Sequence, residues 1–242
     1  RGLSVKFIGA GKQRALCFLR PSPLLNEMPK GRVIWMDATP NKVLMEHLAE
    51  NIGMRFVDTN LPQPLQNIIQ IGDLLWKGDQ LDNHPEAAAL LKYAKENDAL
   101  IIRKKARATD GEAYFGRDER GLNAYKDAPF TVLEGHHAMR ETDAEQAAWA
   151  WGAWSAHCGK PAPFAGAAAL EAKTERTFGD AYRPWKRVQH TIADPLAENI
   201  VRHHYSTTIL QAVARDRDPK KPKFVLSGSP IEYNGKPYPV TL

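Results

Sequence analysis

The sequence predicts an α/β fold in which helices flank a parallel β-sheet. Short apolar runs such as Arg32–Met36 and Ala99–Arg103 end in polar or basic residues, which is typical of buried parallel strands. Segments with helical spacing lie between these runs, so strands and helices alternate along the chain. In such folds the ligand-binding residues follow the carboxyl ends of the strands.

The first part of the chain, residues 1–58, is expected to form a hairpin and then one strand–helix–strand unit. Residues 3–9 and 14–19 are the arms of the hairpin. Arg32–Met36 is a strand ending in Asp37-Ala38-Thr39. Residues 42–51 form a helix closed by Gly53, and residues 54–57 form the next strand. Two prolines within residues 59–64 indicate a linker.

The second part, residues 59–242, continues the alternation and ends in a hairpin. Strands are expected at 66–71, 99–103, 130–135 and 223–227, and helices at 85–97, from the capping box at 142–145 to Gly159, and from Pro195 onward. Residues 160–190 are rich in Pro, Gly and charge, which predicts an irregular insertion. Asn234-Gly235 between β-like flanks predicts the turn of a final hairpin.

Composition limits the classes of function. The 33 Lys+Arg exceed the 28 Asp+Glu, giving +5 and a pI near 9.1, which is compatible with nucleic-acid binding. Two cysteines, Cys17 and Cys158, provide no disulfide framework and no metal cluster, as in a reducing, cytoplasmic compartment. No apolar run approaches the ~20 residues of a membrane span, so we expect no membrane.

The stretch Gln211–Arg217 carries the most specific chemistry. On a helix Gln211 and Arg215 would share one face, while Ile209 and Val213 would face the core. A fixed glutamine and arginine can address a nucleotide, because a guanidinium stays charged and matches phosphate oxygens. The other interpretation is an amphipathic helix with a solvated polar stripe. Similarly, Arg103, Lys104, Lys105 and Arg107 after strand 99–103 could be a solvated edge or phosphate contacts.

Four segments occur in the order found in the C-terminal half of superfamily-2 helicases, and the chain resembles that half. Asp37-Ala38-Thr39 is similar to the Ser-Ala-Thr segment (motif III), and the strand with the basic run lies where motif IV stands. Arg120-Gly121-Leu122-Asn123, in the region that begins at Gly116, is similar to Arg-Gly-(Ile/Leu)-Asp (motif V). Gln211 to Arg215 is similar to Gln-x-x-Gly-Arg (motif VI), with Arg217 where the family has its final arginine, although one residue earlier. Either the helix ends there and a loop carries Arg217, or Arg215 is the only arginine finger.

The resemblance implies a RecA-like (P-loop NTPase-type) fold, with residues 1–58 as the tail of a first domain and 59–242 as the second. It implies catalytic roles for Arg215, Gln211 and Arg217. It also implies that a further set of residues binds the nucleotide and couples its state to the bound nucleic acid: Asp37, Thr39, Gly116, Arg120, Gly121 and Asn123. It implies a nucleic-acid strand, with single-stranded DNA favoured over RNA, on Arg103, Lys104, Lys105 and Arg107.

The cofactors implied are ATP and Mg²⁺, held in the full-length protein and not tightly by this chain. The sequence contains no Gly-x-x-x-x-Gly-Lys-(Ser/Thr) loop and no Asp-Glu-x-(His/Asp) pair. Because it also starts at Arg1, we expect a missing N-terminal RecA-like domain to supply them, and this chain alone to be inactive as an ATP hydrolase.

Two alternatives stay open. The first is a nucleic-acid-binding or protein-interaction module on a degenerate RecA-like fold that never hydrolyses ATP, which the departures from motifs III, V and VI would permit. The second is an unrelated metabolic α/β enzyme. Its candidate bases or ligands would be His136-His137 or His203-His204, although adjacent side chains on one element point to different faces.

Overall fold

A computed structural model gives the structure of the chain. It describes residues 4–8, 15–19, 41–57, 64–71, 81, 83–118, 124–136, 139, 141–157, 170–178, 185–192, 195–229, 231–233 and 236–241. The chain divides into two compact units. Unit 1 contains residues 1–61, 139–174 and 189–203, and unit 2 contains residues 62–138, 175–188 and 204–242. The first division lies three residues after the expected boundary at 58/59, but residues 139–174 and 189–203, expected in the second domain, group with the first.

Unit 2 is built on a sheet of five parallel strands, which confirms the predicted α/β class. In spatial order the strands are β3 (Ile68–Gln70), β9 (Lys223–Leu226), β6 (Thr131–Glu134), β4 (Leu100–Arg103) and β5 (Ala113–Tyr114). Each neighbouring pair is parallel. All five carboxyl ends therefore meet at one edge of the sheet, called here the carboxyl edge, and the amino ends meet at the opposite edge, the amino edge.

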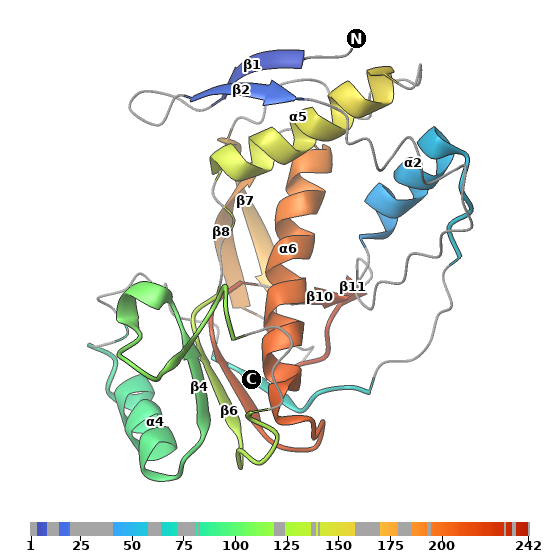
Figure 1. The fold of residues 1–242 in the computed structure, drawn as a ribbon. Coiled ribbons are helices and arrows are strands. Elements are labelled where there is room, and N and C mark those ends of the chain that lie inside the picture. The colour runs from blue at the N-terminus through green and yellow to red at the C-terminus, as the bar shows by residue number, and fades with distance from the viewer. Residues whose placement is uncertain are drawn as a thin grey trace. The chain divides into compact units, whose positions relative to one another are not determined.

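Both faces of the sheet are buried, as the near-continuous apolar runs predict. Side chains of successive strand residues point to opposite faces. Ile102, Leu133 and Val225 pack in one core with helix α6 (Pro195–Val213). Ile101 and Val132 pack in a second core with helix α4 (Pro85–Glu96). Figure 1 shows α4 and α6 on opposite sides of β4 and β6.

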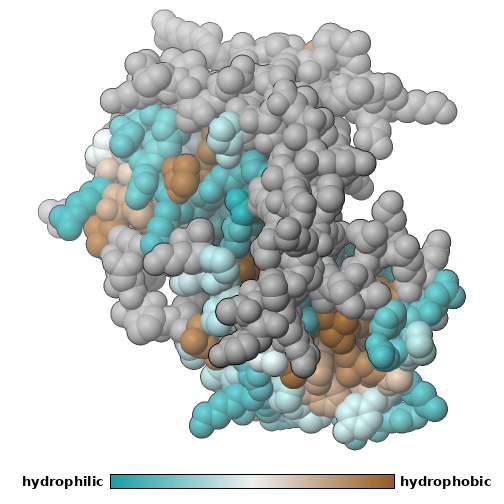
Figure 2. Space-filling model, turned by 180° about the vertical axis from the view of Figure 1, so that it is seen from behind, coloured by the Kyte–Doolittle hydropathy of each residue, from teal (hydrophilic) through white to brown (hydrophobic). Residues whose placement is uncertain are grey.

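Helix α4 begins and ends as its sequence predicts. The side chain of His84 caps the amide of Ala87, Pro85 occupies the first turn, and Asn97 caps the other end. Its outer face carries Tyr93, which is 55% exposed and stacks on Phe130 with ring centroids 5.8 Å apart. Figure 2 shows hydrophobic side chains among hydrophilic ones at the lower right, on the part of unit 2 that carries α4.

Unit 1 contains the predicted N-terminal hairpin, with β1 (Ser4–Ile8) antiparallel to β2 (Ala15–Leu19). Helix α2 (Lys42–Ile52) is capped by Asn41 and closed by Gly53 at φ 69°, as expected of a left-handed helix end. The prediction of a strand at 54–57 is wrong, because this segment has no regular structure. Helix α5 (Glu141–His157) starts before the expected capping box. Ala148 of α5 packs with Leu196 and Ile200.

Two further strand pairs complete the chain. Residues 160–190 were expected to be irregular, but β7 (Leu170–Phe178) pairs with β8 (Trp185–Ile192). Runs of charged and polar residues in both strands interrupt the apolar periodicity that indicates a strand. The final hairpin is confirmed, with β10 (Glu232–Tyr233) antiparallel to β11 (Lys236–Pro237). Beyond it, Thr241 pairs with Ile69 on the free edge of β3.

Candidate functional site

The sheet of unit 2 has a topological switch point between β4 and β6. From β4 the chain continues to β5 on one side, whereas the next strand of the sheet after β6 is β9 on the other side. Ligands of open parallel sheets bind outside the carboxyl ends of the strands at such a point. The residues that follow β4 and β6 are therefore the first candidates for a functional site.

Arg103 and Glu134 close β4 and β6 and are direct partners across the two strands. Arg103 Nη2 lies 3.0 Å from Glu134 Oε2, and Arg107 Nε contacts Glu134 Oε1. Glu134 is fully buried, and Arg103 is only 8% exposed. Arg103 also lies 3.4 Å from Glu112. These two of the four predicted cations thus neutralise the buried Glu134 carboxylate, which is a structural task.

Lys104 and Lys105, between the two arginines, are exposed. Lys104 runs past Gly135, whose φ is 83°, and a Cβ added to this glycine would lie 3.7 Å from Lys104 Cε. At 3.7 Å such a Cβ would make an ordinary van der Waals contact, so it is the positive φ that favours glycine at this position. Within the described residues, neither lysine forms an ion pair. This pair of charges is available to a ligand in solution.

Tyr114 and Arg117, which sequence reasoning missed, lie next to this basic run. The guanidinium of Arg117 lies over the Tyr114 ring, 4.2 Å from its centroid, and Lys105 Nζ lies 5.8 Å from the same centroid. Arg117 Nε donates to Asp118 at 2.7 Å, and Nη2 donates to the Glu112 carbonyl at 3.1 Å. The motif V candidate Gly116 makes the turn between them at φ 95°.

Asp118 is the anchor of that turn. It is 2% exposed and accepts from the Tyr114 amide at 2.9 Å and from the Tyr125 hydroxyl at 3.3 Å, besides Arg117. Burial and the Asp118 charge raise the pKa of Tyr125. Asp118 lies only four positions after Tyr114, whose amide it accepts from. This short spacing is a local signal that the sequence does contain.

A second polar cluster lies at the carboxyl ends of β3, β9 and β6. The hydroxyl of Ser227 lies 2.7 Å from the Tyr205 hydroxyl and 3.1 Å from His136 Nδ1. The amide of Gln70 donates to the carbonyls of Ser227, at 2.6 Å, and Ser229, at 2.7 Å. Of the histidines proposed for a metabolic enzyme, His136 thus reaches the carboxyl edge.

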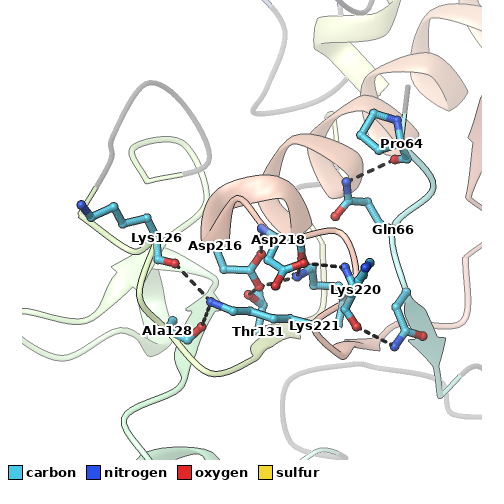
Figure 3. A network of polar contacts seen from close by, with 11 residues as sticks. Pro64, Gln66, Lys126, Ala128, Thr131, Asp216, Asp218, Lys220 and Lys221 are labelled. Carbon is cyan, nitrogen blue, oxygen red and sulfur yellow. Dashed lines mark hydrogen bonds and ion pairs between the residues drawn. The ribbon is translucent and has the colours of Figure 1, made fainter. Parts of the chain in front are cut away.

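The amino edge is held together by a different network, centred on Asp216 (Figure 3). Lys223 donates to both carboxylate oxygens of Asp216 and to the Asp218 carbonyl, and Thr131 Oγ1 donates to Asp216 at 2.9 Å. Burial lowers the pKa of Lys223, against the opposing effect of the Asp216 carboxylate. Lys221 donates to the carbonyls of Lys126 and Ala128 nearby. These groups bind one another.

The predicted nucleotide stretch Gln211–Arg217 ends in this network. Helix α6 stops at Val213, and Ala214–Asp216 form a 3₁₀ turn, so Gln211 and Arg215 are not spaced on one α-helix as expected. The 3₁₀ turn has a physical cause, because it directs the Asp216 side chain inward, where it pairs with Lys223. Arg215 is 9% exposed, whereas Arg217 is exposed in a left-handed conformation at φ 62°. Ile209 and Val213 are buried, as predicted.

The remaining predicted site residues lie outside the described residues. They are Asp37, Thr39, Arg120, Gly121 and Asn123, and the same holds for His137 and the strand expected at 32–36. The described part of the chain contains no group of three His, Cys, Asp or Glu side chains that could hold a metal ion. Within that part, no helix has the length and apolarity that crossing a membrane requires.

Comparisons with protein-family models, with curated proteins and with solved structures found no match for this chain. Unit 2 is a parallel α/β domain with an exposed basic run at the switch point of its sheet.

Proposed function

We propose that this chain is the C-terminal part of an ATP-dependent nucleic-acid helicase or translocase, with unit 2 as its second RecA-like domain. One observation carries the proposal. The basic run that sequence reasoning assigned to nucleic acid follows the carboxyl end of β4 at the switch point, with Lys104 and Lys105 exposed. The order of the motif-like segments along the sequence agrees with it.

In this proposal the nucleic-acid strand lies across the carboxyl edge of the sheet, and its phosphates contact Lys104 and Lys105. Phosphate contacts supply affinity without reading sequence. Arg103 and Arg107 act from beneath, because their ion pairs with Glu134 join the ends of β4 and β6 into one rigid support. Because this support is rigid, a movement of the domain also moves the bound nucleic-acid strand.

ATP would be held chiefly by a preceding RecA-like domain, which would bring the phosphate loop and the magnesium ligands. ATP supplies the phosphoryl group whose transfer drives the motion. From this chain, the exposed Arg217 would meet the phosphates, with Arg215 and Gln211 behind it. An arginine so placed stabilises charge on the transferring phosphoryl oxygens and increases the rate by roughly 10³–10⁵.

A second candidate is a nucleic-acid-binding module that does not hydrolyse ATP. The burial of Arg215 at the amino edge favours it, because a buried guanidinium cannot approach a phosphate without rearrangement. Both candidates use the same basic surface, and they differ only in whether ATP is consumed.

The test is ATP hydrolysis by the full-length protein that contains this chain, with and without single-stranded DNA. The helicase proposal predicts hydrolysis that the strand stimulates, and loss of stimulation in the double variant Lys104→Ala/Lys105→Ala. Lys126→Ala, which removes one exposed charge elsewhere on the same unit, is the control. Strand binding without any hydrolysis would support the second candidate, and failure to bind a strand would refute both.

A further inference from the structure

Arg117 is exposed, yet its guanidinium is held in place by three contacts. Its Nε and Nη2 donate to Asp118 and to the Glu112 carbonyl, and its guanidinium lies 4.2 Å from the centroid of the Tyr114 ring. Its side chain is nevertheless 50% exposed. The contacts engage two of the three guanidinium nitrogens and still leave half of the side chain exposed. A ligand that meets it would cost little side-chain entropy.

The chemistry of that exposed half suits a nucleobase. The guanidinium is planar and weakly hydrated, and it stacks on flat π-systems as well as pairing with anions. Unstacked bases are commonly bound on aromatic rings and on arginine planes. Asp118 partly offsets the charge of Arg117, with which it forms an ion pair at 2.7 Å. The adjacent Lys104 and Lys105 have no ion-pair partner among the described residues and are better suited to phosphate.

We propose that Tyr114 and Arg117 form a stacking ledge for one base of a single strand whose backbone lies on Lys104 and Lys105. The inference rests on the proposed nucleic-acid surface and adds to it a contact with a base. Lys105, within 5.8 Å of the Tyr114 centroid, joins the ledge to the phosphate-binding lysines. Because every base has a flat face, the ledge binds all four without preference for sequence.

The experiment compares two labelled oligonucleotides of equal length, oligothymidine and an abasic strand with the same phosphates, binding to the 242-residue chain. Arg117→Lys keeps the charge and removes the plane, and Tyr114→Leu removes the ring. Both should weaken oligothymidine binding about tenfold and leave abasic binding within about twofold. A strand with one 2-aminopurine should show quenching on the wild-type chain that Arg117→Lys abolishes.

The outcomes separate the ledge from the proposed function. Equal losses on both oligonucleotides would make Arg117 a phosphate contact and overturn the ledge. Unchanged oligothymidine binding in both variants would overturn it as well. If thermal melting shows that Arg117→Lys does not fold, Tyr114→Leu decides by the same criteria. A wild-type chain that binds neither oligonucleotide would refute the nucleic-acid surface itself, and the ledge with it.

Discussion

Lys223 and Asp216 form an ion pair in which neither side chain is exposed to solvent. Lys223 begins β9, and Asp216 ends the 3₁₀ turn after α6. Thr131, which begins β6, donates to the same carboxylate at 2.9 Å. The pair therefore fixes the end of α6 to the amino ends of two central strands, and it determines where the arginines of that turn lie.

Removal of one partner should be costly. Lys223→Met would leave the Asp216 carboxylate buried without its cation, and we expect the free energy of unfolding to fall by about 3–5 kcal/mol. The double variant Asp216→Leu/Lys223→Met should recover most of that loss, because an apolar pair needs no ionic partner. Urea denaturation measures both. If Lys223→Met were as stable as the wild type, the ion pair would not be what fixes the end of α6 to the sheet.

The carboxyl edge of the sheet could be predicted from the sequence, whereas the amino edge could not. The apolar run before Arg103 and the basic run after it are contiguous, so their positions at a strand end follow from local pattern. The ties of Asp216 to Lys223 and Thr131 depend on strand order, which no local pattern contains. For the same reason the sequence leaves open whether the helix ends before Arg217, whereas the structure shows that α6 ends at Val213 and that Arg217, not Arg215, is exposed.

Glu134 provides the corresponding test at the carboxyl edge. It is fully buried between Arg103 and Arg107, so Glu134→Gln should lower the free energy of unfolding by about 3 kcal/mol or more. Glu232→Gln, on the β10 strand, is the control, since its side chain is only partly buried. Denaturant unfolding of the two variants gives the comparison, and equal stability would contradict the role given to Glu134.

Glu112 should make stability depend on pH in the acid range. Burial raises its pKa, but the hydrogen bond from the Thr109 amide and the charge of Arg103 outweigh this effect, and the pKa lies below its ordinary value of 4.5. A lowered pKa means that its stabilising contribution is complete above that value and is lost as pH falls through the folded-state pKa. Wild type should exceed Glu112→Gln by about 1 kcal/mol or less near pH 7. The expected difference therefore shrinks as the pH falls below 4.5, and a difference that stayed constant over the acid range would count against this account.

The two arginines of the α6 turn should behave differently in the full-length protein. Arg217→Ala should lower ATP turnover by about 10³-fold or more with little change in nucleotide affinity or stability, because the side chain is exposed. Arg215→Ala should lower both turnover and the melting temperature, because the side chain is buried. Steady-state kinetics and thermal melting separate the two effects. Full turnover in both variants would refute an arginine finger in this stretch.

The most direct measurement of the central claim is the salt dependence of single-strand binding by the chain. Each phosphate neutralised on a single strand contributes about 0.7 to the slope of log affinity against log salt. If Lys104 and Lys105 each contact a phosphate, Lys104→Ala/Lys105→Ala should weaken binding and reduce the magnitude of the slope by about 1.4, whereas Lys126→Ala should leave it unchanged. A slope identical to that of the wild-type chain would mean that the basic run is only a solvated edge of the sheet, and it would contradict the account.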